Sequence, residues 1–293
     1  MAFLKWAQPE GPWCLCAFNP NDKDGNEAMT FYPGQEDRAL TWLRNVGDAR
    51  NLYWTVNPVR KLMVKKPKRR DIAALTWLHV DIDPRAGHDI AAERRRILDK
   101  LRNPPNGIPR PTCVIFSGGG YQAFWRLNEP FKIEGEEARY EEAKLWNLHL
   151  ERVLGGDHCH NVDRIMRLPG TVNRPDEKKR AKGRTEELAR VEWNDGPNYA
   201  LGEFTKAEAE GGTTSDRKPV AIDPTKVERV EDLGKLPVGD YCKRVIAQGC
   251  DPDDPAKYES RSEALFFVCC EMVRREVPDE IIYAVITDPL NNV

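Results

Sequence analysis

The sequence contains no run of about 20 consecutive apolar residues, which is the length that a membrane-spanning helix requires. Its first ten residues have neither a cationic start nor a long apolar stretch, so they do not form a secretory signal. Lys and Arg total 45 and Asp and Glu total 47, and this balance excludes a polycation that coats nucleic acid by bulk charge. We therefore expect an intracellular protein with no membrane partner.

None of the eight cysteines forms a Cys-x-x-Cys pair, and their spacings match no zinc module. In an intracellular chain they are expected to be small buried hydrophobes. Apolar residues make up 40% of the 293 positions and charged residues 31%, which is enough for a core in one large or two ordinary domains.

Short apolar runs and stretches of helical periodicity alternate irregularly, which predicts an α/β or α+β fold. Strands are expected at residues 12–18, 51–56, 112–117 and 121–127, and a segment from 71 to 78 is expected to lead into another strand. Helices are expected at 36–46, 90–101 and 135–154. A catalytic domain over 1–205, a polar linker over 206–235 and a small helical domain over 236–293 are expected from the change in composition. The abrupt end at Asn291–Val293 suggests a piece of a longer protein.

An acidic motif ends the strand expected before residue 84. In Trp77-Leu-His-Val-Asp81-Ile-Asp83, alternate side chains share a face, so both aspartates point to the same side, roughly 6.5 Å apart at Cα. Two such carboxylates can converge on a shared divalent cation, which would compensate their like charges. Alternatively, the acids cap a turn before Pro84; Asp-x-Asp also recurs in polymerases, nucleases and glycosyltransferases.

Three consecutive glycines, Gly118 to Gly120, join the two strands of an expected hairpin. Their bare backbone can form a nest of N–H groups around phosphate oxygens, assisted by the Ser117 hydroxyl. The alternative is a flexible hairpin loop. A Walker loop is excluded because the Gly-Lys-Ser/Thr ending is missing and a strand follows.

The segment 156–175, which begins as a compact polar loop, holds two further acids and three arginines, two of which lie close to the acids. Its acids are candidates to complete the metal site, and these two arginines to bind triphosphate or template; they are Asp157, Asp163, Arg164 and Arg167. A structural Asp–Arg ion pair is one alternative. A zinc site of His158, Cys159 and His160 is another, although three near-adjacent ligands cannot easily surround one ion.

Two stretches are rich in cations, although the chain as a whole is not. Seven of eleven residues from Arg60 to Arg70, and six of eleven from Arg174 to Arg184, are Lys or Arg. Solvated loops are the simple interpretation, but their position beside the acidic and glycine motifs favours phosphate binding.

Together, and in this order, the motifs over about Asn51 to Arg184 resemble the archaeo-eukaryotic primase superfamily. They are most similar to the primase-polymerases and RepB-like primases of phages and mobile elements. The stretch 261–287 also resembles the small helical domain that often follows such primases, ahead of a helicase.

The resemblance implies a catalytic core with an RRM-like antiparallel or mixed sheet flanked by helices, followed by a small all-α domain. It implies a DNA primase and polymerase that transfers NTP or dNTP units on a single-stranded DNA template during replication, in the cytoplasm of a bacterial host. A helicase domain or protein is a possible partner.

The resemblance also assigns roles to residues. Two Mg²⁺ or Mn²⁺ ions would be held by Asp81, Asp83 and Asp157, with Asp163 as the competing third acid. Nucleotide-binding positions would be Ser117, Gly118, Gly119, Gly120, Gln122, Arg164, Arg167 and Asn173. Template-binding positions would be Lys65, Lys66, Lys68, Arg69, Arg70, Lys178, Lys179 and Arg180. The family's second motif usually has a His where Gln122 stands; Gln can donate a hydrogen bond to phosphate but carries no positive charge.

Two-metal phosphoryl transfer is therefore the favoured mechanism. One rival is a non-catalytic replication initiator, which would bind DNA tightly and with strong salt dependence even without the acids. A second rival is an Asp-x-Asp glycosyltransferase, which leaves the Arg167-Leu-Pro-Gly-Thr171 segment unexplained.

Overall fold

The structure, a computed structural model, describes residues 1–21, 26–85, 87–105, 107–181, 183–208, 229–250, 258 and 261–292, without the side chains of Lys178 and Ser262. The chain divides into two compact units, Met1–Gly211 and Gly212–Val293. Most of the expected linker, residues 209–228, lies outside the described part, so the predicted domain bounds remain a prediction.

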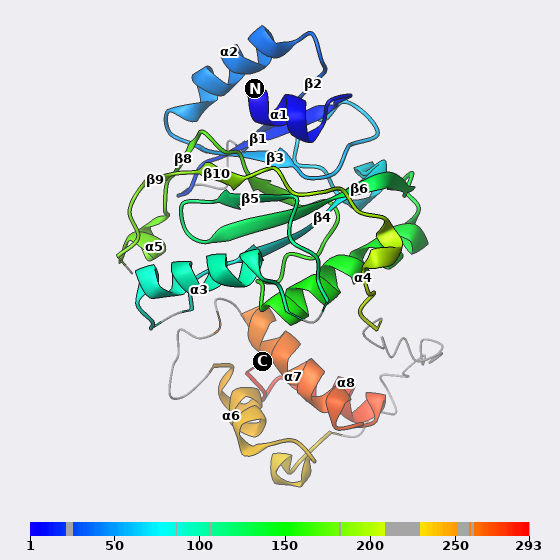
Figure 1. Ribbon diagram of the computed structural model, residues 1–293. Coiled ribbons are helices and arrows are strands. Elements are labelled where there is room, and N and C mark those ends of the chain that lie inside the picture. Colours follow the sequence, from blue (N-terminus) through cyan, green and yellow to red (C-terminus); the bar gives the residue numbers. More distant parts are fainter. Residues whose placement is uncertain are drawn as a thin grey trace. The chain divides into compact units, whose positions relative to one another are not determined.

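Antiparallel sheets form the centre of the first unit (Figure 1). One four-stranded sheet has the order β2-β1-β3-β7, and its strands are β1 Trp13–Phe18, β2 Glu27–Phe31, β3 Asn51–Thr55 and β7 Ile165–Arg167. The other has the order β10-β5-β6-β4, with β4 Ala74–Ile82, β5 Cys113–Phe116, β6 Tyr121–Lys132 and β10 Arg190–Trp193. A two-stranded ladder pairs β8 Val172–Asn173 with β9 Glu187–Leu188.

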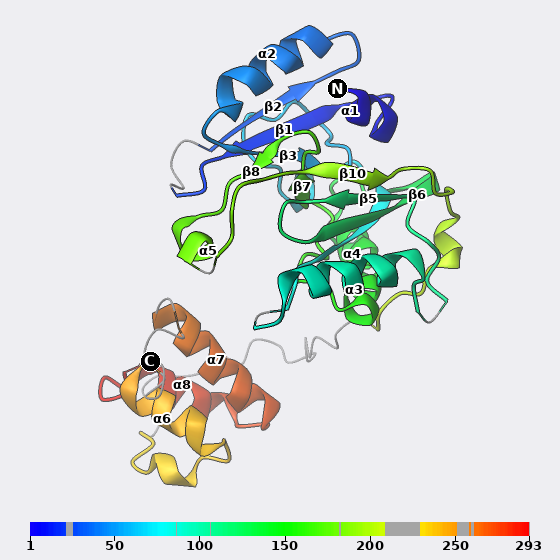
Figure 2. The ribbon, with the colours of Figure 1, turned by 60° about the vertical axis from the view of Figure 1, so that its left-hand side comes forward.

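Helices cover these sheets in layers. They are α1 Ala2–Ala7, α2 Glu36–Gly47, α3 Ile90–Arg102, α4 Glu137–Leu154 and the short α5 Glu177–Ala181. Figures 1 and 2 both show α3 and α4 on one side of the β10-β5-β6-β4 sheet and the other large sheet on its opposite side, with α2 beyond that sheet. The turn that follows β5 lies against the end of β4 and against Asn173 of β8.

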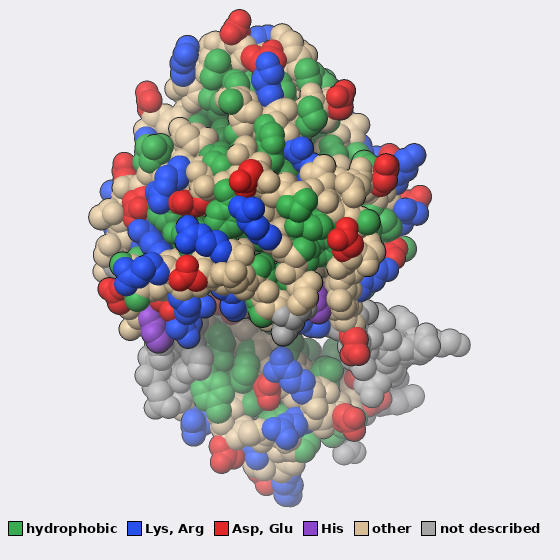
Figure 3. All heavy atoms as spheres, in the orientation of Figure 1, with side chains coloured by type: hydrophobic (Ala, Val, Ile, Leu, Met, Phe, Trp, Pro, Cys, Tyr) green, Lys and Arg blue, Asp and Glu red, His purple; other side chains and the backbone are tan. Residues whose placement is uncertain are grey.

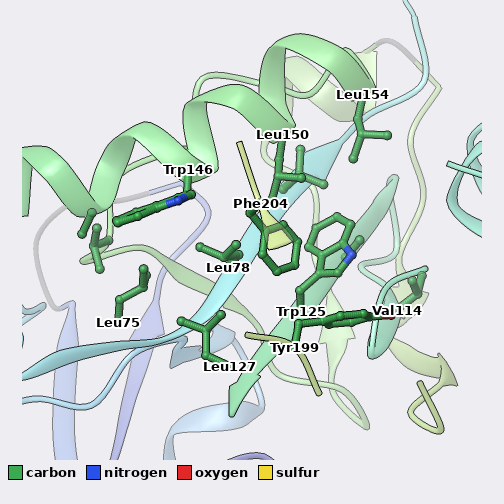
Figure 4. Packing of buried hydrophobic residues seen from close by; sticks show 14 of the residues in the cluster. Leu75, Leu78, Val114, Trp125, Leu127, Trp146, Leu150, Leu154, Tyr199 and Phe204 are labelled. Atoms are coloured by element: carbon green, nitrogen blue, oxygen red, sulfur yellow. The ribbon is translucent and has the colours of Figure 1, made fainter. Parts of the chain in front are cut away.

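The period-2 pattern of β4 separates two apolar cores. Leu78, Val80 and Ile82 pack into the cluster beneath α3 and α4, whereas Trp77 belongs to the cluster that includes the other sheet. Figure 4 shows Leu78 beneath Trp146 and Leu150 of α4, with Trp125 close by. Burying such side chains contributes about 1.5–3 kcal/mol each.

The second unit is helical over its described residues. Its helices are α6 Asp240–Gln248, α7 Arg261–Arg274 and α8 Asp279–Thr287. They share a core of small and branched side chains, including Val245, Val268, Met272 and Val285, all of which are fully or almost fully buried. Val230 and Leu233, within the expected linker, pack against this core.

The structure confirms the α+β class and most of the expected elements. The strand expected to follow from the segment 71–78 and to carry the acidic motif is β4, Ala74–Ile82, and a 3-10 turn, η1 Arg69–Asp71, precedes it. Strand β2 and helices α1 and α6 were not expected from the sequence. Lys206 and Ala207, where the linker was expected to begin, pack on α4, and the Ala207 amide donates to the Leu145 carbonyl at 3.0 Å.

Five of the eight cysteines are buried, as expected, while Cys250, Cys269 and Cys270 are half-buried. Among the helices that the structure describes, none combines the length and the apolarity that crossing a bilayer requires.

Candidate active site

A cavity of about 820 Å³ opens where β3, β4, β7 and the β5–β6 hairpin come together. Eleven of the residues singled out in the sequence line it: Lys66, Asp81, Asp83, Ser117, Gly118, Gly119, Gln122, Arg164, Arg167, Asn173 and Lys179. Residues that lie more than a hundred positions apart in the sequence, such as Lys66 and Lys179, therefore line one polar cavity. The other singled-out residues do not line it: Lys65, Lys68, Arg69, Arg70, Gly120, Asp157, Asp163 and Arg180. The Lys178 side chain lies outside the described part.

Asp81 is placed by the alternation of β4 on the face opposite the α3–α4 core. Its Oδ2 accepts a hydrogen bond from Gln122 Nε2 at 3.4 Å, and its buried Oδ1 has no hydrogen-bond partner among the described residues. Burial, and then the charge of Asp83, raises the pKa of Asp81 to about 7; Asp157 adds to this effect. An anionic Asp81 thus needs a compensating positive charge.

Asp157, not Asp163, lies beside this pair. The Asp157 amide donates to the Asp81 carbonyl at 2.8 Å. Burial and the neighbouring Asp83 raise the pKa of the Asp157 carboxyl. Asp163 instead accepts a hydrogen bond from the Tyr140 hydroxyl at 2.7 Å.

The glycine turn approaches β4 very closely. A Cβ on Gly120 would lie 2.1 Å from the Ile82 carbonyl oxygen and 2.6 Å from Asp83 Oδ1, so glycine is required for this contact. The Ser117 hydroxyl oxygen accepts from the amides of Gly119 at 3.4 Å and Gly120 at 3.2 Å. Those two amides are therefore hydrogen-bonded within the turn. The sequence analysis expected them to bind phosphate oxygens instead.

Two arginines hold the carbonyl side of the turn. Arg184 ends the second cation-rich stretch, whereas the sequence analysis did not single out Arg94. Arg94 of α3 donates to the carbonyls of Gly118 and Gly119, both at 3.3 Å, and pairs with Glu187 at 2.7 Å. Arg184 donates to the Gly119 carbonyl at 3.1 Å and lines the cavity. Arg94 lies in a run of three arginines that looks like a solvated helix face, so the sequence offers little signal for it.

Arg167 is buried at the back of the cavity. Its guanidinium lies 4.3 Å from the centre of the Tyr53 ring, and Nη2 donates to the Tyr53 hydroxyl at 3.1 Å and to Asn173 Oδ1 at 2.7 Å. Its Nη1 has no partner within the described part of the chain. Burial lowers the pKa of Arg167. The backbone amide of Arg167 donates to Gln122 Oε1 at 3.0 Å, so Gln122 links Asp81 to β7.

The basic segments contribute unequally. Lys66 and Lys179 line the cavity, whereas Arg69 pairs with Glu137 and Glu141 of α4 and Arg180 pairs with Glu186. Figure 3 shows Lys and Arg side chains, with a few acids among them, over the side of the first unit where Figure 1 places α3 and α5.

Within the described ranges, no group of three or more His, Cys, Asp or Glu side chains is close enough to enclose a metal ion. The zinc alternative is therefore unsupported: His158 and His160 both direct Nδ1 to Glu151. The acids nevertheless fit divalent cations chemically, because carboxylate oxygens are hard ligands and Asp81 Oδ1 is buried without a donor.

Residues 78–203 match the model of the RepB DNA-primase N-terminal domain. No curated protein matches the chain.

Solved structures with a related fold include the primase-polymerase domain of cyanophage S-2L, at 19% identity over 69% of this chain and 92% of that one, with a TM-score of 0.47. Primase RepB' is similar at 14% identity over 68% of this chain and 56% of that one, with a TM-score of 0.46. The catalytic domain of RepB', solved with initiator DNA, also matches at 14% identity, over 69% of this chain and 86% of that one, with a TM-score of 0.46.

The family match begins at Leu78 in β4, ends at Glu203, and includes every cavity motif described above except the Lys66 segment and the β1 and β3 residues. This part of the chain is therefore similar to the RepB DNA-primase N-terminal domain.

Proposed function

We propose that the first unit is a primase-polymerase that transfers nucleotides from NTP or dNTP to a 3′-hydroxyl on a single-stranded DNA template, with release of pyrophosphate. The observation that carries the proposal is the unpartnered, buried Oδ1 of Asp81 beside Asp83 and Asp157. Asp81 and Asp83 line a cavity that is lined on other sides by cations, and Asp157 lies next to them outside this lining. Such a combination suits a substrate that brings both metal ions and phosphates.

Asp81, Asp83 and Asp157 would hold two Mg²⁺ or Mn²⁺ ions, whose Lewis acidity activates the attacking hydroxyl and stabilises the leaving pyrophosphate. The protein's own contribution is positioning and fixed charge. Asp81 is kept in place by Gln122 and by the strand pairing of β4 with β6. Asp83 is held against the Gly120 turn.

Arg167 is the best-placed group for the triphosphate. Tyr53 and Asn173 fix its guanidinium, and Nη1 remains for a ligand oxygen. A buried, pre-oriented guanidinium binds phosphate strongly because little conformational entropy is lost. Arg164 and Lys179 line the same cavity and add charge. Gln122, in the place of the family's His, orients Asp81 and the β7 backbone instead of supplying charge.

Lys66 at the cavity wall makes the segment of Lys65, Lys66 and Lys68 the candidate template contact. Arg69 and Arg180 are weaker candidates since ion pairs with glutamates already engage them. A helicase partner and replication of a phage or mobile element complete the proposal.

Incorporation of labelled NTPs and dNTPs on single-stranded templates, with and without primer, tests the proposal at fixed Mg²⁺ or Mn²⁺. Asp81→Asn and Asp83→Asn should abolish incorporation while circular dichroism stays native. Asp163→Asn is the matched control and should keep activity, because Asp163 is engaged by Tyr140. Full activity of both cavity variants would refute the proposal.

A non-catalytic initiator gives a different result in the same experiment. The wild-type protein would then incorporate nothing, and its salt-dependent DNA binding would survive Asp81→Asn unchanged.

A further inference from the structure

Two buried polar side chains on α4 are unexplained by the core that surrounds them. Asn147 is fully buried and Glu151 is 5% exposed. They lie one helical turn apart, so they present adjacent groups on the same face of α4. Uncompensated burial of an amide and a carboxylate would cost several kcal/mol, so their partners should matter.

Glu151 uses both carboxylate oxygens on the loop that carries Asp157. Its Oε2 accepts from the Cys159 amide at 3.0 Å and lies 2.9 Å from His160 Nδ1. Its Oε1 lies 3.0 Å from His158 Nδ1. A carboxylate can only accept, so both histidines donate to it from Nδ1. One buried acid thus holds three consecutive residues directly after Asp157.

Asn147 joins the same loop to β4. Its Oδ1 accepts from the His79 amide at 3.0 Å, and its Nδ2 donates to the His160 carbonyl at 3.2 Å. The His79 ring completes the connection, because Nε2 donates to the Cys159 carbonyl at 2.9 Å. The backbone of Cys159 is therefore fixed at its amide by α4 and at its carbonyl by β4.

The start of the loop lies directly on the acidic end of β4. A Cβ on Gly156 would be 2.4 Å from Val80 Cγ2 and 2.9 Å from the Asp81 carbonyl oxygen. The next amide, that of Asp157, donates to this same carbonyl. Asp157 is consequently held between a tight backbone contact on one side and the Glu151 and Asn147 contacts on the other.

We propose that Glu151 and Asn147 are positioning residues that set Asp157 against Asp81 and Asp83 for divalent-cation binding. This inference rests on the proposed function, since it takes Asp157 as a metal ligand. It goes beyond the metal-binding acids themselves, because groups that orient metal ligands commonly change metal affinity 10–100-fold when removed.

Mn²⁺ binding, measured from the electron paramagnetic resonance signal of free Mn²⁺, tests the inference without nucleotide or turnover. Glu151→Ala should weaken binding by about tenfold. Glu151→Gln should stay within about threefold of wild type, since Gln keeps an acceptor for the Cys159 amide and a donor for a histidine ring. The matched control is Glu142→Gln on the same helix, whose partner is the exposed Lys206, and it should bind as wild type does.

Kinetics separate positioning from a general loss of folded protein. In Glu151→Ala the Mn²⁺ concentration for half-maximal incorporation should rise in parallel with the dissociation constant, which a smaller active fraction would not cause. Should Glu151→Ala fail to fold, Glu151→Asp keeps the charge, shortens the reach by one methylene, and has the same expected effect.

Asp157→Ala separates the two levels of inference. If it weakens Mn²⁺ binding while folded Glu151→Ala or Glu151→Asp binds normally, the positioning role is overturned and the proposed function stands. If Asp157→Ala and Asp81→Asn both bind Mn²⁺ normally, the metal-site assignment in the proposed function is itself wrong, and the positioning role is lost with it.

Discussion

Replacing Gly120 by alanine tests the close contact between the glycine turn and the acidic end of β4. The added Cβ would lie 2.1 Å from the Ile82 carbonyl oxygen and 2.8 Å from Asp83 Cα, distances that require backbone movement. Overpacking of this kind costs about 1–3 kcal/mol. For a unit of this size, each kcal/mol lowers Tm by about 2–4 °C. A loss of about 2 kcal/mol therefore corresponds to a Tm lower by about 4–8 °C.

Gly119→Ala is the matched control in the same turn. Its Cβ would meet Asp83 Oδ1 at 3.4 Å and Arg184 Nη1 at 3.6 Å, which are tolerable contacts with movable side-chain ends. We expect a Tm within about 2 °C of wild type. Alanine lowers the conformational entropy of the unfolded chain, and this stabilising effect offsets the small strain in the folded turn.

Tryptophan fluorescence during heating is a suitable assay, because all eight tryptophans lie in the first unit. Gly120→Ala should also weaken Mn²⁺ binding, since the strain falls on Asp83. Equal melting temperatures for the two alanine variants would refute the close-contact argument.

Three further predictions concern the core. The Arg126 guanidinium lies 4.5 Å from the centre of the Trp6 ring and 4.6 Å from that of Trp77. Arg126→Ala should therefore lower the free energy of unfolding, measured by urea titration, by about 2 kcal/mol. Replacing the exposed Arg102 by Ala should leave it almost unchanged. Trp125→Ala should lower the free energy of unfolding by about 3–5 kcal/mol, because the ring is fully buried. Leu188 is half-exposed, so Leu188→Ala should lower it by less than about 0.5 kcal/mol, and similar losses for the two variants would contradict the core assignment. Burial lowers the pKa of His79 to about 4, so the unfolded ring, with a pKa near 6.5, takes up its proton first as the pH falls. Between pH 6.5 and 4 the wild type should therefore lose on the order of 3 kcal/mol relative to His79→Gln, and parallel pH profiles would disprove this.

The acidic motif and the glycine turn were predictable because their signals are local. Alternation along Trp77–Asp83 sets the direction of each side chain, and any strand at this place puts Asp81 opposite the Leu78 face. Antiparallel pairing of β4 with β6 then places Gln122 opposite Asp81 in the register.

The supporting groups were not predictable, because they depend on distant contacts. Tyr53, which underlies Arg167, is an ordinary aromatic residue of a strand until β7 pairs with β3. Glu151 resembles the many solvated acids of α4, and only its position one turn after Asn147 on an apolar face is unusual. The choice between Asp157 and Asp163 likewise depends on which part of the α4–β7 loop rests on β4.

Strand β10 has a consequence for any shortened version of the protein. It covers the outer edge of β5, whose four residues, Cys113–Phe116, are all buried. A chain that ends before Arg190 would expose that apolar edge, and an exposed strand edge can pair with strands of other molecules. Phe204 belongs to the core beneath α3 and α4 that also contains Val114 and Phe116 of β5. The Ala207 amide donates a hydrogen bond to α4. Preparations of the first unit that stop at residue 208 should stay dispersed, whereas those stopping before 190 should precipitate.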